Sequence, residues 1–181
     1  RKIHSASIPR VGGAAILAGM LPALAALALL GGSAGRWARA LDSRMIAVLG
    51  GAGVLFLVGL ADDIWSLRAR VKLLAQVAAA GAVCSVGVRV HSLHIQGLVN
   101  VDFGLWSYPI TILWIVGMTN ALNLIDGLDG LASGIGLIAA GAMMVLAWWP
   151  GLGGLMVAMV ALAGGLPGVL SFHLPPARLF L

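Results

Sequence analysis

The fold is decided by the stretch Met45-Ile-Ala-Val-Leu-Gly-Gly-Ala-Gly-Val-Leu-Phe-Leu-Val-Gly-Leu-Ala61, which is followed directly by Asp62 and Asp63. Spanning a bilayer takes about 20 predominantly apolar residues in a helix, because the hydrocarbon core is about 30 Å thick. This run is short for a span but carries no charge, and in lipid a helix satisfies every backbone polar group internally. It therefore predicts a membrane helix that ends at two carboxylates.

The composition of the whole chain agrees with this interpretation. The 181 residues are 61% hydrophobic and only 9% charged, whereas a soluble domain usually carries about 25% charged residues. A mean hydropathy of +1.05 places the chain in lipid rather than in water. We attribute the net charge of +5 to orientation and lipid headgroups and predict no nucleic-acid partner. The single cysteine, Cys84, lies in an apolar run and is expected to be buried.

Further apolar runs follow, so we expect an all-α polytopic membrane protein that forms a single domain over residues 1–181. The chain starts at Arg1 and ends at Leu181 inside an unfinished pattern, which we interpret as a fragment of a longer protein. The six expected spans are residues 11–30, 45–61, 73–88, 108–123, 131–149 and 152–172.

The charges lie mainly in the connections between these runs, and their distribution predicts the orientation. Seven cations fall on the side of the chain start and four on the other side. Cytoplasmic loops carry an excess of Lys and Arg, so the loops after Asp62 and Asp126 are predicted to be cytoplasmic. The two sets are Arg1, Lys2, Arg10, Arg68, Arg70, Lys72 and Arg178 against Arg36, Arg39, Arg44 and Arg89.

The outer stretch 89–107 alternates in part between apolar and polar residues and contains Gly97, Asn100 and Gly104. This pattern predicts a short external β-hairpin or an irregular loop. His91 and His94 have a spacing that metal ligands can use, but a solvated loop is the interpretation we favour.

The six acidic residues indicate where the chemistry lies. Asp42 and Asp102 fall in predicted outer loops, while the other four lie at cytoplasmic helix ends, namely Asp62, Asp63, Asp126 and Asp129. A charge at mid-bilayer costs roughly 2.5–3.5 kcal/mol, and less at the rim. Because the chain is so poor in charge, we expect a bound cation to compensate these carboxylates.

The first acidic pair is followed by Arg68, Arg70 and Lys72. Mg²⁺ prefers oxygen ligands and is shared with substrate phosphates. The carboxylates are therefore predicted to hold Mg²⁺, with Mn²⁺ as an alternative, while the cations neutralise a diphosphate. The competing interpretation is an interfacial loop with ordinary ion pairs.

The second acidic pair belongs to the segment Asn120-Ala-Leu-Asn123-Leu-Ile-Asp126-Gly127-Leu-Asp129-Gly130. Successive polar residues are three apart and share a helix face if the helix continues. The two glycines are predicted to break the helix and to let the backbone approach a ligand. A helix-packing seam through Gly130 and Gly134 is the alternative, which explains the glycines but not the Asn and Asp residues.

Together with the basic chain start, these segments resemble the polyprenyl-phosphate N-acetylhexosamine-1-phosphate transferases, a family that includes phospho-MurNAc-pentapeptide translocase. The order and spacing fit across essentially the whole chain, and the start resembles the GlcNAc-type branch more closely. The matching motifs are Arg1-Lys2-x-His4, Pro9-Arg10-x-Gly12-Gly13, Gly59-x-x-Asp62-Asp63, Lys72-Leu73-x-x-Gln76, Asn120-x-x-Asn123-x-x-Asp126-Gly127-x-Asp129-Gly130 and Pro176-Ala177-Arg178-Leu179-Phe180.

The resemblance implies that the phosphate of undecaprenyl phosphate attacks the β-phosphorus of a UDP-sugar, expected to be UDP-GlcNAc, and that UMP leaves. It implies a bacterial plasma-membrane enzyme with a cytoplasmic active site that initiates cell-envelope glycan synthesis, and it leaves a homodimer open. Family members have ten or eleven spans, and their principal metal-binding Asp would follow just beyond Leu181. The 181 residues alone are therefore expected to be inactive.

By similarity, Asp62 is the candidate base or organiser of the lipid phosphate, and Asp63 would support it. The implied metal ligands are Asp62, Asp63, Asn123 and Asp126. The implied substrate-binding residues, among which Phe180 would stack on uracil, are His4, Arg10, Lys72, Asn120, Asn123, Asp126, Gly127, Asp129 and Phe180.

Three alternatives stay open. A transporter would place its carboxylates at mid-span, whereas these lie at span ends. An intramembrane prenyltransferase would space acids three or four apart in both loops, which Asp62-Asp63 does not do. A non-catalytic scaffold left by gene truncation also fits the sequence.

Overall fold

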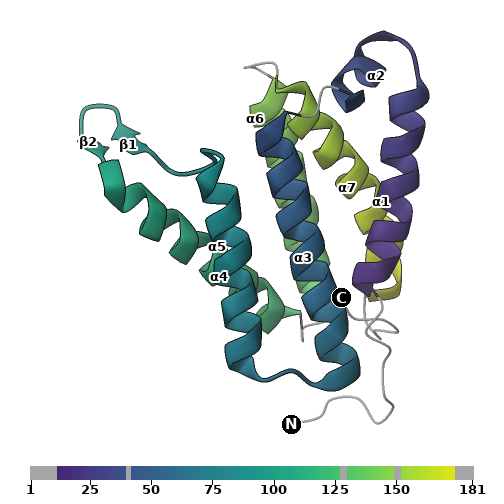
Figure 1. Cartoon of the computed structure of the whole chain (residues 1–181). Helices are drawn as coiled ribbons and strands as arrows, with labels where there is room; N and C mark the ends of the chain where they lie inside the picture. Colours follow the sequence, from purple (N-terminus) through teal and green to yellow (C-terminus); the bar gives the residue numbers. More distant parts are fainter. Residues whose placement is uncertain (1–11, 40–41, 127–129, 149–151, 174–181) are drawn as a thin grey trace. The chain divides into compact units, whose positions relative to one another are not determined.

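A computed structural model describes residues 12–39, 42–126, 130–148 and 152–173 of the chain (Figure 1). The chain divides into two compact units, of which unit 1 comprises residues 1–41 and 122–181 and unit 2 comprises residues 42–121. We describe each unit by itself, and the single domain expected from the sequence stays a prediction.

The described residues confirm an all-α membrane architecture with a small two-stranded hairpin. In this part of the chain five helices are long and apolar enough to cross a membrane. They correspond to five of the six expected spans and are Gly12–Leu29, Ser43–Trp65, Gly104–Ile125, Leu131–Trp148 and Gly153–Ser171.

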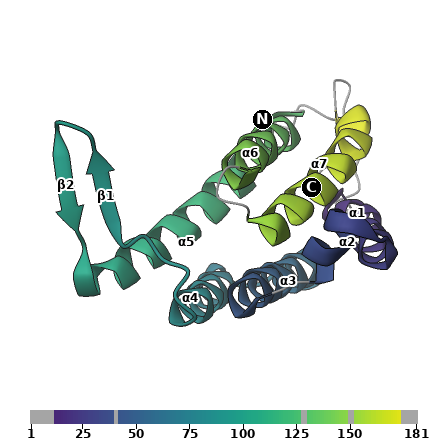
Figure 2. The same ribbon diagram turned by 90° about the horizontal axis from the view of Figure 1, so that it is seen from above.

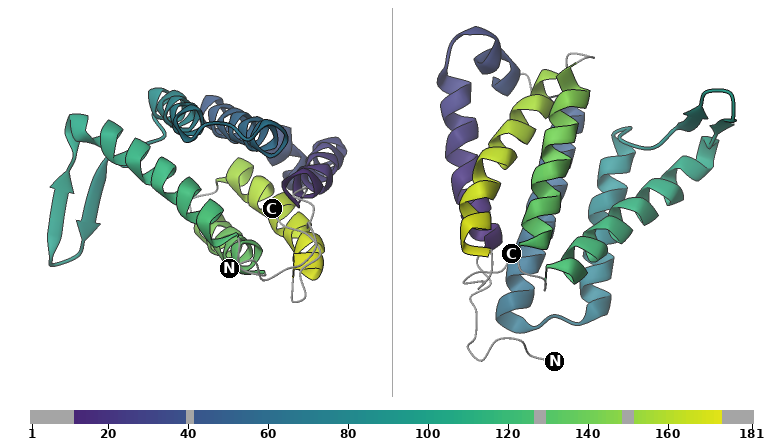
Figure 3. Two further views of the ribbon diagram at one scale, coloured as in Figure 1. Left: turned by 90° about the horizontal axis from the view of Figure 1, so that it is seen from below. Right: turned by 180° about the vertical axis from the view of Figure 1, so that it is seen from behind.

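Unit 1 contains four helices, α1 (Gly12–Leu29), α2 (Gly32–Arg39), α6 (Leu131–Trp148) and α7 (Gly153–His173). Helix α7 packs against both α1 and α6, and α2 contacts α1 and α7. Figure 2 shows α7 between α1 and α6, and the rear view in Figure 3 shows the same three helices.

Small residues allow the helices of unit 1 to approach one another closely. A Cβ added at Gly165 of α7 would lie 3.4 Å from the backbone oxygen of Ile16 in α1. On the other side of α7, a Cβ added at Gly136 would lie 3.6 Å from the Leu166 side chain. Both α6 and α7, which pack against each other, also contain buried alanines. Small residues are common at such interfaces in membranes, because the hydrophobic effect contributes little to helix association in lipid.

Helix α2 lies in the connection between the first two expected spans, where the sequence predicts no helix. The helix has 8 residues, too few to cross a bilayer. Its Trp37 packs so closely on the start of α7 that a Cβ added at Gly153 would collide with the indole ring. A cavity of about 220 Å³ lies beside this contact, lined by Trp37, Ala147, Trp148, Gly153 and Met156.

Unit 2 begins with α3 (Ser43–Trp65) and α4 (Ala69–Ser85), which pack against each other. Gly51 of α3 lies against α4, since an added Cβ would lie 3.1 Å from a methyl group of Val83. Cys84 is buried, as the sequence predicts.

Two helix bounds in unit 2 differ from the expected spans, with consequences for the site. Helix α3 extends past residue 61, so that Asp62 and Asp63 lie in its last turn. Helix α4 has 17 residues, or about 26 Å at the usual rise per residue, and its first turns contain Arg70 and Lys72. Because this is shorter than the hydrocarbon core, the expected third span stays a prediction.

The rest of unit 2 is the hairpin of β1 (Ser92–Ile95) and β2 (Val99–Asp102), a 3-10 turn η1 (Gly104–Trp106) and the first part of α5 (Ser107–Ile125). The two strands are antiparallel and pair Ser92 with Asp102 and Ile95 with Val99. This confirms the predicted β-hairpin.

Candidate active site

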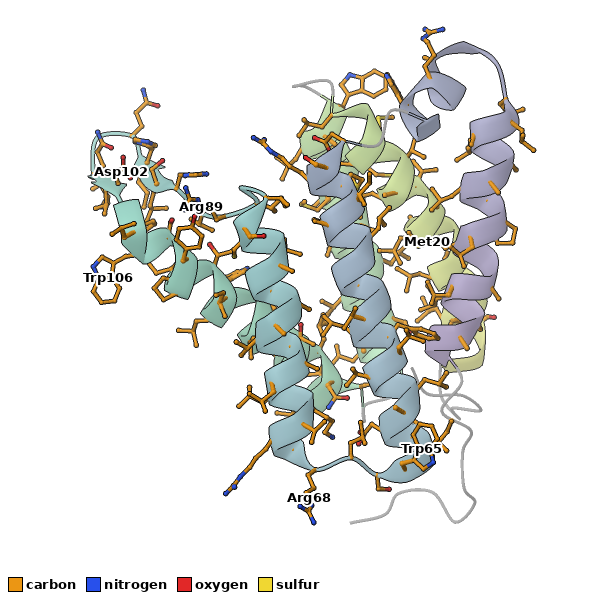
Figure 4. The ribbon with its side chains drawn as sticks, in the orientation of Figure 1. Met20, Trp65, Arg68, Arg89, Asp102 and Trp106 are labelled. Carbon is orange, nitrogen blue, oxygen red and sulfur yellow. The ribbon has the colours of Figure 1, made fainter. Side chains whose placement is uncertain are left out.

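A tight turn at the end of α3 brings the next helix back toward the carboxylates. Ser66 adopts a left-handed backbone conformation with φ of 49°, and its N–H donates to the backbone oxygen of Asp62 at 2.7 Å. Helix α4 then begins at Ala69. Figure 4 shows Trp65 and Arg68 at this end of the α3–α4 pair.

The turn allows Lys72 of α4 to pair with Asp62 of α3. The Lys72 Nζ lies 2.9 Å from Asp62 Oδ2, and the two side chains are 35% and 26% exposed. A partly exposed ion pair of this kind contributes about 0–1 kcal/mol to stability. The pair therefore places a cation and a carboxylate together without contributing much to the fold.

A second polar contact lies one turn further along α4. The side-chain amide nitrogen of Asn120, on α5, donates to Gln76 Oε1 at 2.6 Å and to the backbone oxygen of Val116 at 2.8 Å. These two bonds orient the Asn120 carboxamide and leave its Oδ1 as an acceptor that no described residue uses.

The two contacts form one continuous feature. Lys72 and Gln76 are four residues apart on α4 and therefore lie on the same helix face. One partner comes from the end of α3 and the other from α5, so the feature joins all three helices within unit 2. We call this set, Asp62, Lys72, Gln76 and Asn120, the α4 polar track.

Two further predicted site residues continue along α5. Asn123 is exposed in the last turn of the helix. Asp126 follows the helix end, where its N–H donates to the Leu122 oxygen at 3.1 Å and its side-chain Oδ1 is buried. The chain thus carries Asn120, Asn123 and Asp126 at three-residue steps, as the sequence predicts.

The predicted helix break is confirmed at Gly130. This residue has a left-handed φ of 75°, which glycine adopts without steric cost, and α6 begins at the next residue. The alternative of a packing seam receives no support at Gly134, where an added Cβ would meet nothing within 4 Å.

The remaining predicted residues are less informative. Asp63, Arg68 and Arg70 are exposed near the α3–α4 turn. Among the described residues, no three His, Cys, Asp or Glu side chains gather into a group that could hold a metal ion, His91 and His94 included. The predicted site residues His4, Arg10, Gly127, Asp129 and Phe180 lie outside the described residues.

The two acids assigned to outer loops have local structural roles. Asp42 is the N-cap of α3, with Oδ1 accepting the Met45 N–H at 2.8 Å. Asp102 Oδ1 accepts the Gly104 N–H at 3.1 Å and ties the end of β2 to η1. Neither role applies to the side chain of Asp62, which pairs with Lys72 of the next helix.

Comparison with known proteins decides the family. Residues 45–181 match the model of glycosyl transferase family 4. The chain belongs to glycosyl transferase family 4. The matched region includes both acidic motifs and the whole α4 polar track, and it confirms the resemblance stated from the sequence motifs.

The relatives of this family 4 chain are polyprenyl-phosphate sugar-1-phosphate transferases and related enzymes. A probable undecaprenyl-phosphate N-acetylglucosaminyl 1-phosphate transferase of Bacillus subtilis is 36% identical over 100% of this chain and 48% of its own length. A decaprenyl-phosphate N-acetylglucosaminephosphotransferase of Mycobacterium leprae is 33% identical over 100% and 48%. A phospho-N-acetylmuramoyl-pentapeptide-transferase of Desulforudis audaxviator is 33% identical over 100% and 59%. The chain spans about half the length of these relatives.

Sequence reasoning places Gln76 in a family motif but assigns it no role, whereas the structure shows its contact with Asn120. The spacing of four residues from Lys72 was the available signal, because it puts both side chains on one helix face. The partner of Gln76 lies 44 residues away in sequence and leaves no local pattern.

Proposed function

We propose that this chain forms part of a membrane enzyme that transfers a sugar-1-phosphate from a UDP-sugar to a polyprenyl phosphate and releases UMP. The names of the relatives support a polyprenyl phosphate acceptor, and two of the three support GlcNAc-1-phosphate as the transferred group. We further propose that the site faces the cytoplasm of a bacterial plasma membrane.

The observation that carries this proposal is the α4 polar track. It joins a carboxylate, an ammonium group and two carboxamides at one end of the α3–α4–α5 group of unit 2. Arg68 and Arg70 are exposed at the same end. Catalysis of phosphoryl transfer requires mainly positioning and neutralisation of negative charge, which this arrangement suits.

In the proposed reaction, Asp62 accepts the proton of the lipid phosphate or orients its attacking oxygen. That oxygen forms a bond to the β-phosphorus of the UDP-sugar, and the bond from this phosphorus to the bridging oxygen breaks as UMP leaves. Lys72 is 2.9 Å from Asp62 and turns its ammonium group toward the phosphate oxygens, where it offsets their charge. Gln76 keeps the Asn120 carboxamide in place during the step.

The oxygen donors near this track fit Mg²⁺, which binds one or two carboxylates and completes its shell with water and substrate phosphates. Only one oxygen of Asp62 pairs with Lys72, so Oδ1 can serve as a ligand, with the adjacent Asp63 as a further donor. The expected ligands Asn123 and Asp126 belong to unit 1 and stay a prediction. A bound Mg²⁺ would neutralise charge on the diphosphate.

A transporter is the competing function, and its carboxylates would titrate or bind ions in mid-membrane. The described residues favour the enzyme, because Asp62 lies in the last turn of α3 and Asp126 lies just beyond the end of α5.

The proposal is tested by UMP release from UDP-GlcNAc and polyprenyl phosphate, measured with the full-length protein in membranes. We expect Asp62→Asn to lower turnover about 10²–10⁴-fold, the usual contribution of a catalytic acid or base, and Asp126→Asn to lower turnover by weakening the binding of metal or substrate. Asp102→Asn is the matched control, because this carboxylate only ties β2 to η1. Normal turnover in both site variants would contradict the assignment.

A further inference from the structure

The β1–β2 hairpin has one apolar face and one polar face. The register pairs Leu93 with Val101 and Ile95 with Val99, and alternate residues of a strand lie on the same face. These four side chains therefore share one face of the ribbon. The opposite face carries Ser92, His94, Asn100 and Asp102.

The apolar face is not covered by any described part of the chain. Its four side chains are between 38% and 46% exposed, and Leu98 in the turn is 81% exposed. An isolated two-stranded hairpin is at best marginally stable in water. A hairpin with such a face gains stability only if another apolar surface covers it.

The hairpin is fixed at the start of a candidate membrane span. The Val90 N–H donates to Thr111 Oγ1 at 2.9 Å, and that hydroxyl donates to the Ser107 oxygen at 2.7 Å. The Arg89 guanidinium lies over the Tyr108 ring, 4.2 Å from its centroid. These contacts attach the base of the hairpin to the first turns of α5, at the start of this candidate span.

The neighbouring side chains are those expected at a membrane surface. Leu105 and Trp106 are 84% and 73% exposed at the start of the same span, and tryptophan is enriched where lipid meets water. Arg89 is half-buried with its Nε enclosed, and it forms no ion pair with a described residue, so its charge is left uncompensated within the described part of the chain. Figure 4 shows Arg89, Asp102 and Trp106 at this end of unit 2, away from Arg68.

We propose that the hairpin is a membrane-surface element whose apolar face rests on the lipid bilayer beside the start of α5. In this arrangement the apolar face and the exposed Trp106 both contact lipid, and the polar face meets water. Arg89 contacts the phosphate groups of the lipid. This proposal does not depend on the proposed function.

The test compares the two faces of one hairpin in the full-length protein, reconstituted in bilayers that contain phosphatidylglycerol. Cys84 and any other native cysteine of the full-length protein are first replaced by alanine, and single cysteines carrying a polarity-sensitive fluorophore are introduced by Leu93→Cys or Ile95→Cys. The matched controls are His94→Cys and Asn100→Cys on the polar face. Each labelled protein must retain the melting temperature of the unlabelled protein, and Val99→Cys replaces any apolar-face variant that does not.

We expect labels on the apolar face to show blue-shifted emission, strong quenching by nitroxide-labelled lipids and loss of quenching by aqueous iodide. Labels on the polar face should show the reverse. Equal iodide quenching on both faces would overturn the proposal in favour of a solvated loop. Apolar-face labels shielded from both iodide and nitroxide lipids would also overturn it, because protein rather than lipid would then cover the face.

Discussion

Asp42 and Asp62 lie at opposite ends of α3, and their energetic effects on the helix are opposite. Asp42 caps the N-terminus, where a carboxylate is favourable, and its bond is worth about 1 kcal/mol. Asp62 and Asp63 lie in the last turn, where a negative charge opposes the helix dipole by about 0.3–1 kcal/mol. The ion pair with Lys72 contributes about 0–1 kcal/mol, which is no larger than this unfavourable interaction with the helix dipole. Stability therefore does not explain the carboxylate of Asp62, whereas the proposed binding of a metal ion that also holds the substrate phosphates would.

At the same scale, Gln76 gives a prediction that separates positioning from catalysis. Gln76→Met removes the hydrogen-bond acceptor for Asn120. Losing this bond should raise the activation free energy by about 1 kcal/mol, because Asn120 is less well oriented, and should lower kcat about fivefold. KM for the UDP-sugar should change less than kcat. Gln96→Met is the matched control in the exposed hairpin turn. The two variants should show equal expression and thermal stability, and an unchanged kcat for Gln76→Met would exclude the positioning role.

At the scale of the element, α2 illustrates a helix that depends on tertiary contact. With 8 residues it is too short to be stable alone in water, and the sequence has no apolar run there that predicts a helix. Its position depends on the fit between the Trp37 ring and Gly153, where α7 begins. A glycine is required there because any Cβ would occupy the space of the indole.

This contact predicts the effect of one methyl group. Gly153→Ala should destabilise the protein by about 1–3 kcal/mol through overpacking, seen as a lower melting temperature and an altered tryptophan emission. Gly164→Ala is the control in the same helix, since its added Cβ meets nothing within 4 Å, and should stay within about 0.5 kcal/mol. Equal melting temperatures for the two variants would show that α2 does not depend on this fit.

At the scale of the whole molecule, the sequence predicts the membrane architecture well, because long apolar runs leave helix as the stable choice in lipid. It also predicts the hairpin from partial alternation and the break at Gly130 from the glycines of the Asn/Asp segment. It does not predict α2 or the Gln76–Asn120 bond, which arise from contacts between residues distant in sequence. It does not predict that α3 extends through Asp62, because the two adjacent charges indicate the end of a membrane helix.

The central proposal is that Asp62, in the last turn of α3, helps to bind a metal ion and the substrate phosphates. The most direct test uses Mn²⁺ with UDP, bound to full-length protein that carries a single nitroxide at Arg68→Cys or Leu98→Cys, with Cys84 and any other native cysteine replaced by alanine. Residue 68 follows Asp62, and residue 98 lies in the hairpin turn of the same unit. We predict paramagnetic broadening of the label at residue 68 and none at residue 98. No broadening at residue 68, or broadening at residue 98, would contradict the claim.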